Sequence, residues 1–281
     1  MRILLLGTAA IALSGCSFLG LGGQSKHDNY NSQTGYYGQS TGQAATSTCH
    51  TGNCLARWNI EGGVGPAFIV GGDAVTANKS NNNAGTAFNQ ISMDTAYDEG
   101  VRAELGASYA LSPNNKISVL GHFEEADSAG RQNWGSIGGA ELTGALTDFK
   151  SVGAEIGLRH YFQPTNGVIL NSVRPYVEGR LGASHVDDIA IRGARLGNAD
   201  VAAGNDIGFY KDSWVGSAAG LVGIETPIAQ YMTIGLETGV RHTTGLRSDN
   251  SVLSPGTDLA GLNNGGARTT IPLTLRGRYR F

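Results

Sequence analysis

The sequence predicts an all-β protein, an eight-stranded antiparallel up-and-down transmembrane β-barrel over residues 57–281. Three observations favour this fold: strand-length segments with alternating apolar and polar residues, connections that alternate between long and short, and charges confined to one parity of the segments. The 43 glycines, 7 prolines and 15% charged residues fit an exported β protein. A net charge of -3 provides no basic surface for nucleic acid, so no nucleic-acid partner is expected.

The amino-terminus has the features of a secretory signal. Its apolar run, residues 3–13, is too short to span a bilayer as a helix but suits the core of a signal peptide. The tetrapeptide LSGC that ends at Cys16 resembles the lipobox of bacterial lipoproteins. This resemblance implies that residues 1–15 are removed and that Cys16 carries diacylglycerol and acyl groups. The alternative is a cysteine that lies near the cleavage site by chance.

Residues 16–56 are expected to form a lipidated flexible tether, because they are rich in small polar residues and show no periodicity. Their tyrosines and glutamines also suggest a partner-binding tail as an alternative. Cys49 and Cys54 are expected to close a small disulfide loop in an oxidising compartment. His50 lies between them, but two thiols and one imidazole lack a fourth ligand, so no metal site and no cofactor is predicted.

Eight segments have the length that a tilted strand needs to cross a bilayer. In chain order they are residues 57–70, 101–111, 116–124, 151–162, 174–184, 214–225, 231–243 and 271–281. The connections 71–100, 125–150, 185–213 and 244–268 are long, whereas 112–115, 163–173 and 226–230 are short. A barrel with two unlike ends is therefore predicted, with the long connections at the cell exterior.

Every charged residue in these segments lies on the parity opposite the apolar residues. Because a Lys or Arg that faces lipid at mid-depth costs about 2 to 4 kcal/mol, this placement is what a membrane would enforce. The interior of an eight-stranded barrel is just wide enough for side chains, so the sequence predicts a plugged lumen with an ion-pair network. The predicted network consists of Glu61, Arg102, Glu104, Glu155, Arg159, Glu178, Arg180, Glu237, Arg241, Arg276, Arg278 and Arg280, with Glu124, Arg174 and Glu225 on the same faces.

Alternation by itself also fits a soluble sandwich or a lipocalin-like barrel. Aromatic residues near the ends of the segments favour the membrane, because Trp, Tyr and Phe gather at membrane interfaces. Those expected at the inner interface are Trp58, Tyr109, Phe162, Tyr279 and Phe281, and those at the outer interface are Phe68, Phe123 and Trp214.

The last segment, IPLTLRGRYRF, resembles the carboxy-terminal strand of bacterial outer-membrane barrels. Over residues 57–281 the chain resembles the eight-stranded superfamily that includes OmpA-, OmpX- and OmpW-like proteins. The resemblance implies residence in the outer membrane of a diderm bacterium. It also implies that Tyr279 and Phe281 form the signal that the barrel-insertion machinery reads.

The function expected from these features is that of a non-enzymatic envelope anchor or surface display scaffold, lipid-anchored as well as membrane-spanning. Its partners are outer-membrane lipid and an envelope or surface protein or polysaccharide, contacted through residues 17–56 or the long connections. The plain alternative for those connections is four solvated loops.

Two other functions stay open: a narrow channel, and an enzyme that modifies lipid A. The enzyme hypothesis depends on resemblance to lipid A hydrolases, which use a histidine with a serine near the outer rim. The candidates are His242, followed by Thr243 and Thr244 where a serine is wanted, and His185 beside Ser184, Asp187 and Asp188.

Overall fold

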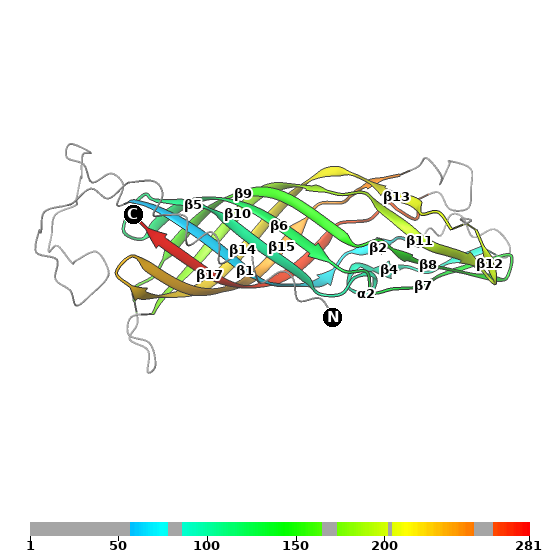
Figure 1. Ribbon diagram of the computed structural model, residues 1–281, viewed down its shortest axis with the longest axis horizontal. Coiled ribbons are helices and arrows are strands. Elements are labelled where there is room, and N and C mark those ends of the chain that lie inside the picture. The colour runs from blue at the N-terminus through cyan, green and yellow to red at the C-terminus, as the bar shows by residue number, and fades with distance from the viewer. Residues whose placement is uncertain (1–56, 78–85, 165–172, 202–203, 250–260) are drawn as a thin grey trace, which may run out of the picture. The chain divides into compact units, whose positions relative to one another are not determined.

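The computed structural model describes residues 57–77, 86–164, 173–201, 204–249 and 261–281. Eight strands in these ranges form a closed antiparallel barrel, which confirms the predicted fold class (Figure 1). They are β1 (Trp58–Gly71), β5 (Gly100–Ala110), β6 (Asn115–Ala126), β9 (Phe149–Tyr161), β10 (Arg174–Val186), β14 (Ser213–Ala229), β15 (Met232–Thr243) and β17 (Arg268–Arg280). The predicted signal, the tether, Cys16, Cys49 and Cys54 lie outside the described residues.

Each barrel strand pairs with its neighbours in the chain, and β1 closes the barrel against β17. In that closing pair Val64 lies opposite Leu275 and Glu61 lies opposite Arg278, so apolar and charged residues share the two faces as the alternation predicted. Two boundaries differ from the prediction by three residues or more. The last strand begins at Arg268 rather than at Ile271, and β14 continues to Ala229, so the turn into β15 is shorter than expected.

The outer surface of the barrel is apolar. Large hydrophobic side chains project from every barrel strand, with Leu105 59% exposed and Leu181 64% exposed. Aromatic rings gather at the end of the barrel that carries the short turns, which we call the turn end: the Trp58 and Tyr109 ring centroids are 5.0 Å apart, and those of Tyr279 and Phe281 are 5.3 Å apart. A soluble protein buries its large apolar side chains and exposes its charges, whereas this barrel exposes an apolar band and buries its charges. The exposed band is therefore the lipid-facing surface.

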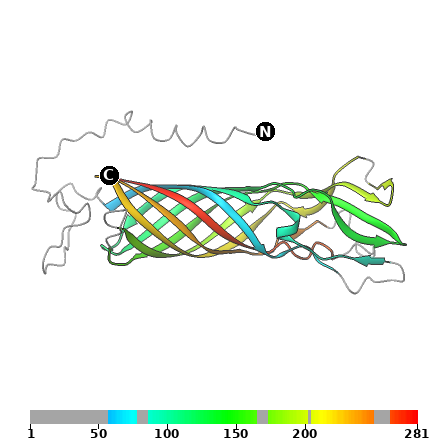
Figure 2. The same ribbon diagram turned by 90° about the horizontal axis from the view of Figure 1, so that it is seen from below.

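The described parts of the long connections fold into strands and a short helix rather than into four separate loops. They form a second sheet from β3 (Thr86–Phe88), β7 (Gln132–Ile137), β8 (Ala140–Leu146), β11 (Ile189–Leu196), β12 (Ala199–Asp200), β13 (Ile207–Lys211) and β16 (Arg247–Ser248). A two-stranded sheet of β2 (Asp73–Val75) and β4 (Ile91–Ser92) and the short helix α2 (Met93–Ala96) accompany it. We call these elements the extension (Figure 2). No helix among the described residues is long and apolar enough to cross a membrane.

A hydrophobic core runs through the extension and into the adjoining end of the barrel. Trp134 and Phe209 pack edge to face with ring centroids 5.2 Å apart. The same cluster includes inward side chains at the ends of barrel strands: Ala126 of β6, Phe149 of β9, Val186 of β10 and Val215 of β14. The polarity of the interior therefore inverts along the barrel, from charged in the lipid-facing part to apolar where the extension begins.

Candidate functional site

The centre of the lumen holds four charged side chains in mutual contact. Arg276 Nη2 lies 2.6 Å from Glu104 Oε2 and 2.8 Å from Glu237 Oε1. Arg180 lies 2.9 Å from Glu104 Oε2 and 2.7 Å from Glu237 Oε1. None of the four side chains is more than 3% exposed. Each buried charge thus has two partners of opposite sign, which offsets the cost of removing it from water.

Toward the turn end, a second group of ion pairs continues the cluster. Arg159 Nη2 lies 3.0 Å from Glu61 Oε2 and 2.8 Å from Glu178 Oε2. Arg278 Nη2 pairs with Glu225 Oε1 at 2.6 Å. Glu178 also accepts from Arg180, and this contact joins the two groups.

Toward the extension, a third group completes the network. Arg102 lies 3.0 Å from Glu124 and 3.1 Å from Glu155. Arg241 pairs with Glu155 at 2.8 Å, and Arg268 pairs with Glu124 at 2.9 Å. Because these side chains come from five different strands, the pairs join opposite walls of the barrel and fill the space between them.

The structure brings together most of the charged residues that the sequence analysis singled out. Those in the lumen are Glu61, Arg102, Glu104, Glu124, Glu155, Arg159, Glu178, Arg180, Glu225, Glu237, Arg241, Arg276 and Arg278. Arg280 and Arg174 lie instead at the turn end, where they donate to the backbone carbonyls of Gln230, at 3.3 Å, and of Pro113, at 2.7 Å. Tyr279 and Phe281 end the chain there with exposed rings.

Three buried basic side chains of the lumen were missed, those of Lys116, His122 and Arg268. Lys116 lies with Nζ 5.0 Å from the centroid of the Tyr161 ring, and His122 Nε2 lies 2.9 Å from Ser184 Oγ. Both lie on β6 an even number of residues from Glu124, and residues two apart on a strand face the same side of the sheet. The alternation could therefore have identified them as lumen-facing. Arg268 was missed because the predicted last segment began three residues after it.

Apolar and aromatic side chains lie where the lumen meets the extension. The guanidinium of Arg268 lies 3.7 Å from the centroid of the Phe149 ring, which is the contact between the charged network and the apolar core. Beyond this contact the buried phenols of Tyr97 and Tyr210 belong to the core, and burial raises the pKa of each above its ordinary value. Tyr210 donates to the backbone carbonyl of Ala74 at 2.8 Å, so its neutral hydroxyl has a partner.

The residues considered for lipid A chemistry do not assemble into a nucleophile and base. His242 is exposed on the lipid-facing surface, with Nδ1 3.1 Å from Thr269 Oγ1. Ser184 points into the lumen, whereas His185, the next residue, packs outward against Trp214 and lies 3.9 Å from Asp187 and 3.6 Å from Asp212. Consecutive strand residues face opposite sides of the sheet, so Ser184 and His185 cannot act together.

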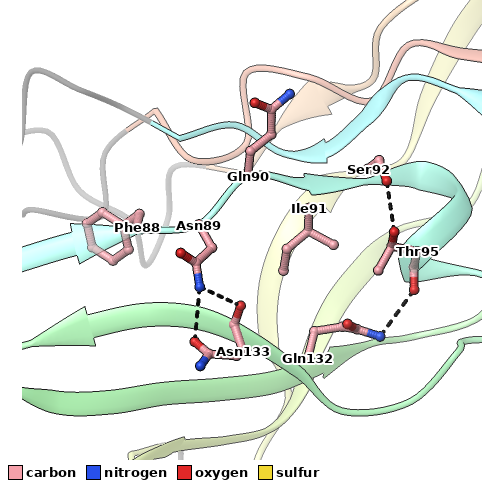
Figure 3. Close-up of a pocket in the computed structure, with 8 residues that line it drawn as sticks. All are labelled: Phe88, Asn89, Gln90, Ile91, Ser92, Thr95, Gln132 and Asn133. Atoms are coloured by element: carbon pink, nitrogen blue, oxygen red, sulfur yellow. Dashed lines mark hydrogen bonds between the residues drawn. The ribbon is translucent and has the colours of Figure 1, made fainter.

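A second candidate site lies in the extension, in an open groove of about 680 Å³ (Figure 3). Its lining is neutral and rich in side-chain amides: Phe88, Asn89, Gln90, Ile91, Ser92, Thr95, Gln132 and Asn133. Figure 3 shows the side chain of Ile91 between two bridges, one from Asn89 to Asn133 and the other from Gln132 to Thr95. Among the described residues, no group of three or more His, Cys, Asp or Glu side chains is arranged to hold a metal ion.

A scan against protein-family models finds no match, and a search of curated proteins finds none either. Among solved structures, the chain is similar to Neisserial surface protein A, at 13% identity and a TM-score of 0.37, over 80% of this chain and 97% of that one. It is similar to Ail, the attachment invasion locus protein of Yersinia pestis, at 14% identity and a TM-score of 0.34, over 80% and 99%. It is also similar to the outer membrane protease OmpT from Escherichia coli, at 10% identity and a TM-score of 0.38, over 83% and 100%.

Proposed function

We propose that this chain is a bacterial outer-membrane lipoprotein whose barrel acts as a closed scaffold and displays the extension at the cell surface. In this proposal the barrel neither conducts solutes nor catalyses a reaction. The extension supplies the surface on which a protein or polysaccharide partner binds.

The observation that carries the proposal is the inversion of polarity along the barrel. In the lipid-facing part, charges lie inside and apolar side chains lie outside. In the extension, apolar side chains such as Trp134 and Phe209 lie inside, while Arg192 and Asp206 are exposed. The first arrangement suits hydrocarbon and the second suits water, so the extension is a water-exposed body that the barrel holds clear of the membrane.

The exposed Lys150–Glu125 pair marks the level at which the inversion occurs. Both residues lie on the outward parity of their strands, at the ends of β9 and β6 next to the extension, with Nζ 3.2 Å from Oε1. Charges on this face would be costly in hydrocarbon but are tolerated near the interface. The long connections of outer-membrane barrels generally face the cell exterior, which supports an extension outside the cell.

The ion-paired lumen and the apolar core above it both favour a scaffold over a channel. Moving a hydrated ion through the lumen would require breaking several buried pairs at once, and the largely apolar core offers few polar partners for the ion. The acyl groups expected on Cys16 would hold the amino-terminal tether at the membrane, where residues 17–56 would be available to an envelope partner.

The test combines conductance with surface accessibility of the full-length protein. Purified protein in planar bilayers is expected to give no steady conductance, and intact cells treated with an external protease are expected to lose fragments of the extension only after prolonged digestion, since it is folded. If the extension resisted digestion on intact cells but was cleaved after the cells were permeabilised, it would lie on the periplasmic side of the membrane. That result would contradict display at the cell surface. Large, steady conductance would contradict the closed lumen.

A further inference from the structure

The groove in the extension lies where the sheet divides. β3 pairs with β7 as far as Phe88, opposite Gly135, and the Asn89 backbone N–H donates to the Trp134 carbonyl at 3.0 Å. The chain then leaves β7, and Ile91 pairs with Val75 of β2 instead. The space between the diverging chains is the groove, and side chains rather than backbone hydrogen bonds span it.

Two bridges fix the walls of the groove. Asn89 Nδ2 donates to Asn133 Oδ1 at 3.2 Å, and Gln132 Nε2 donates to the Thr95 carbonyl at 3.1 Å. Asn133 is held in turn by Glu141, whose Oε1 accepts from Asn133 Nδ2 at 2.6 Å. Since the amide donors are engaged within the protein, the side chains are oriented before a ligand arrives, which lowers the entropic cost of binding.

The same bridges leave acceptors available. Asn89 Oδ1 and Gln132 Oε1 receive no hydrogen bond from any part of the chain that the structure describes. Ile91 lies between the two bridges, and Phe88 adds an aromatic side chain at the edge of the groove. The groove thus combines amide acceptors, the hydroxyls of Ser92 and Thr95, and two apolar surfaces, without an ionised side chain in its lining.

We propose that this groove binds a neutral saccharide. Sugar hydroxyls donate to amide oxygens and accept from hydroxyls, and the C–H faces of a sugar ring pack against apolar and aromatic side chains. A volume of about 680 Å³ lies in the range of small-ligand sites and accommodates a short oligosaccharide. The proposal adds a ligand class to the proposed display function, and its site lies on the displayed extension.

Two other ligand classes fit less well. A sulfated or phosphorylated polymer would meet carboxylates behind the amides, because Glu141 holds Asn133 and Asp73 Oδ1 accepts from Gln90 Nε2 at 2.7 Å. An extended peptide that added a strand to β7 would have to displace the Asn89 bridge to the Asn133 carbonyl and side chain.

The test measures ligand binding to the full-length protein in lipid nanodiscs. The probes are neutral hexasaccharides of glucose, N-acetylglucosamine and mannose, a heparin-derived sulfated hexasaccharide, and an uncharged twelve-residue peptide. Calorimetric titration is expected to show saturable binding of at least one neutral probe. The double variant Asn89→Asp, Gln132→Glu keeps the shapes of both side chains but removes the two amide donors that bridge the walls of the groove, and it is expected to weaken that binding by about tenfold or more.

The matched control is Asn198→Asp, which makes the same chemical change at an exposed position of the extension, between β11 and β12. It is expected to leave binding unchanged. Resistance of the extension to protease confirms that the variants are folded. Binding of no neutral probe, binding of only the sulfated probe or the peptide, or equal losses in Asn198→Asp would each overturn the proposal. None of these outcomes bears on conductance or surface exposure, so the display function is tested separately.

Discussion

Replacing Arg276 by alanine is expected to destabilise the barrel by about 3 to 5 kcal/mol, because three buried carboxylates lose a guanidinium that they share. The guanidinium lies 2.6 Å from Glu104 and 2.8 Å from Glu237, and 3.5 Å from Glu61. In this variant Arg180 continues to pair with Glu104 and Glu237, and Arg159 continues to pair with Glu61. Glu104→Ala is expected to have a comparable effect, since Arg276, Arg180 and Arg102 all pair with Glu104.

The free energy of unfolding is measured by urea titration of the barrel in lipid vesicles, followed by tryptophan fluorescence. Lys150→Ala is the matched control, because it breaks an ion pair whose side chains are 46% and 30% exposed. Exposed pairs contribute about 0 to 1 kcal/mol, so this variant is expected to unfold almost as the parent does. A similar small loss in Arg276→Ala and Lys150→Ala would mean that the lumen is hydrated and that the network does not plug it.

Replacing Phe209 by alanine is expected to cost the extension about 3 to 5 kcal/mol while leaving the barrel folded. The Phe209 side chain is 0% exposed, and its ring packs against those of Trp134 and Tyr210 at centroid distances of 5.2 and 4.9 Å. The cavity that alanine leaves lies in the core of the extension. The barrel strands are held by their own hydrogen bonds and by the lumen network, so they do not depend on this ring.

Limited proteolysis in nanodiscs measures the effect on the extension, and the shift in electrophoretic mobility between heated and unheated samples reports the barrel. Phe209→Ala is expected to be cut rapidly in the extension and to keep the mobility of a folded barrel. Val201→Ala, which shortens an apolar side chain that is 48% exposed, serves as the control and is expected to resist cleavage. Loss of the barrel in Phe209→Ala would show that the two parts fold as one unit.

The barrel strands could be predicted because a membrane imposes a simple rule on them. In the lipid-facing part of the barrel each outward side chain meets lipid, so charged residues such as Arg276 and Glu104 lie on the inward parity there, and the alternation is visible in one sequence. The rule identifies which residues face the lumen but not which of them pair. Arg276 and Glu104 meet across 172 positions of the sequence, and only the closure of the barrel brings them together.

The extension escaped prediction because its strands are short and pair between different connections. β3 and β16 have three and two residues, too few to show a period. β8 pairs with β11, and β13 pairs with β16, so these four strands depend on partners from other connections. Core residues such as Trp134 and Phe209 lie in segments rich in glycine and polar residues, where a single aromatic residue carries little signal on its own. The groove was invisible for the same reason, since Asn89 and Asn133 meet only when β3 and β7 pair.

We expect hydrocarbon to surround the barrel and water to surround the extension, and the accessibility of spin labels to dissolved reagents measures both environments. Single nitroxides are placed at Leu105, Leu273 and Asn198 of the full chain, with Cys16, Cys49 and Cys54 replaced by serine, and the protein is studied in lipid bilayers. Labels at Leu105 and Leu273 are expected to collide with dissolved oxygen but not with a water-soluble nickel chelate, and the label at Asn198 is expected to show the reverse. Shielding of Leu105 and Leu273 from both reagents would mean that these side chains form a dry protein core, which would contradict the orientation of the barrel faces.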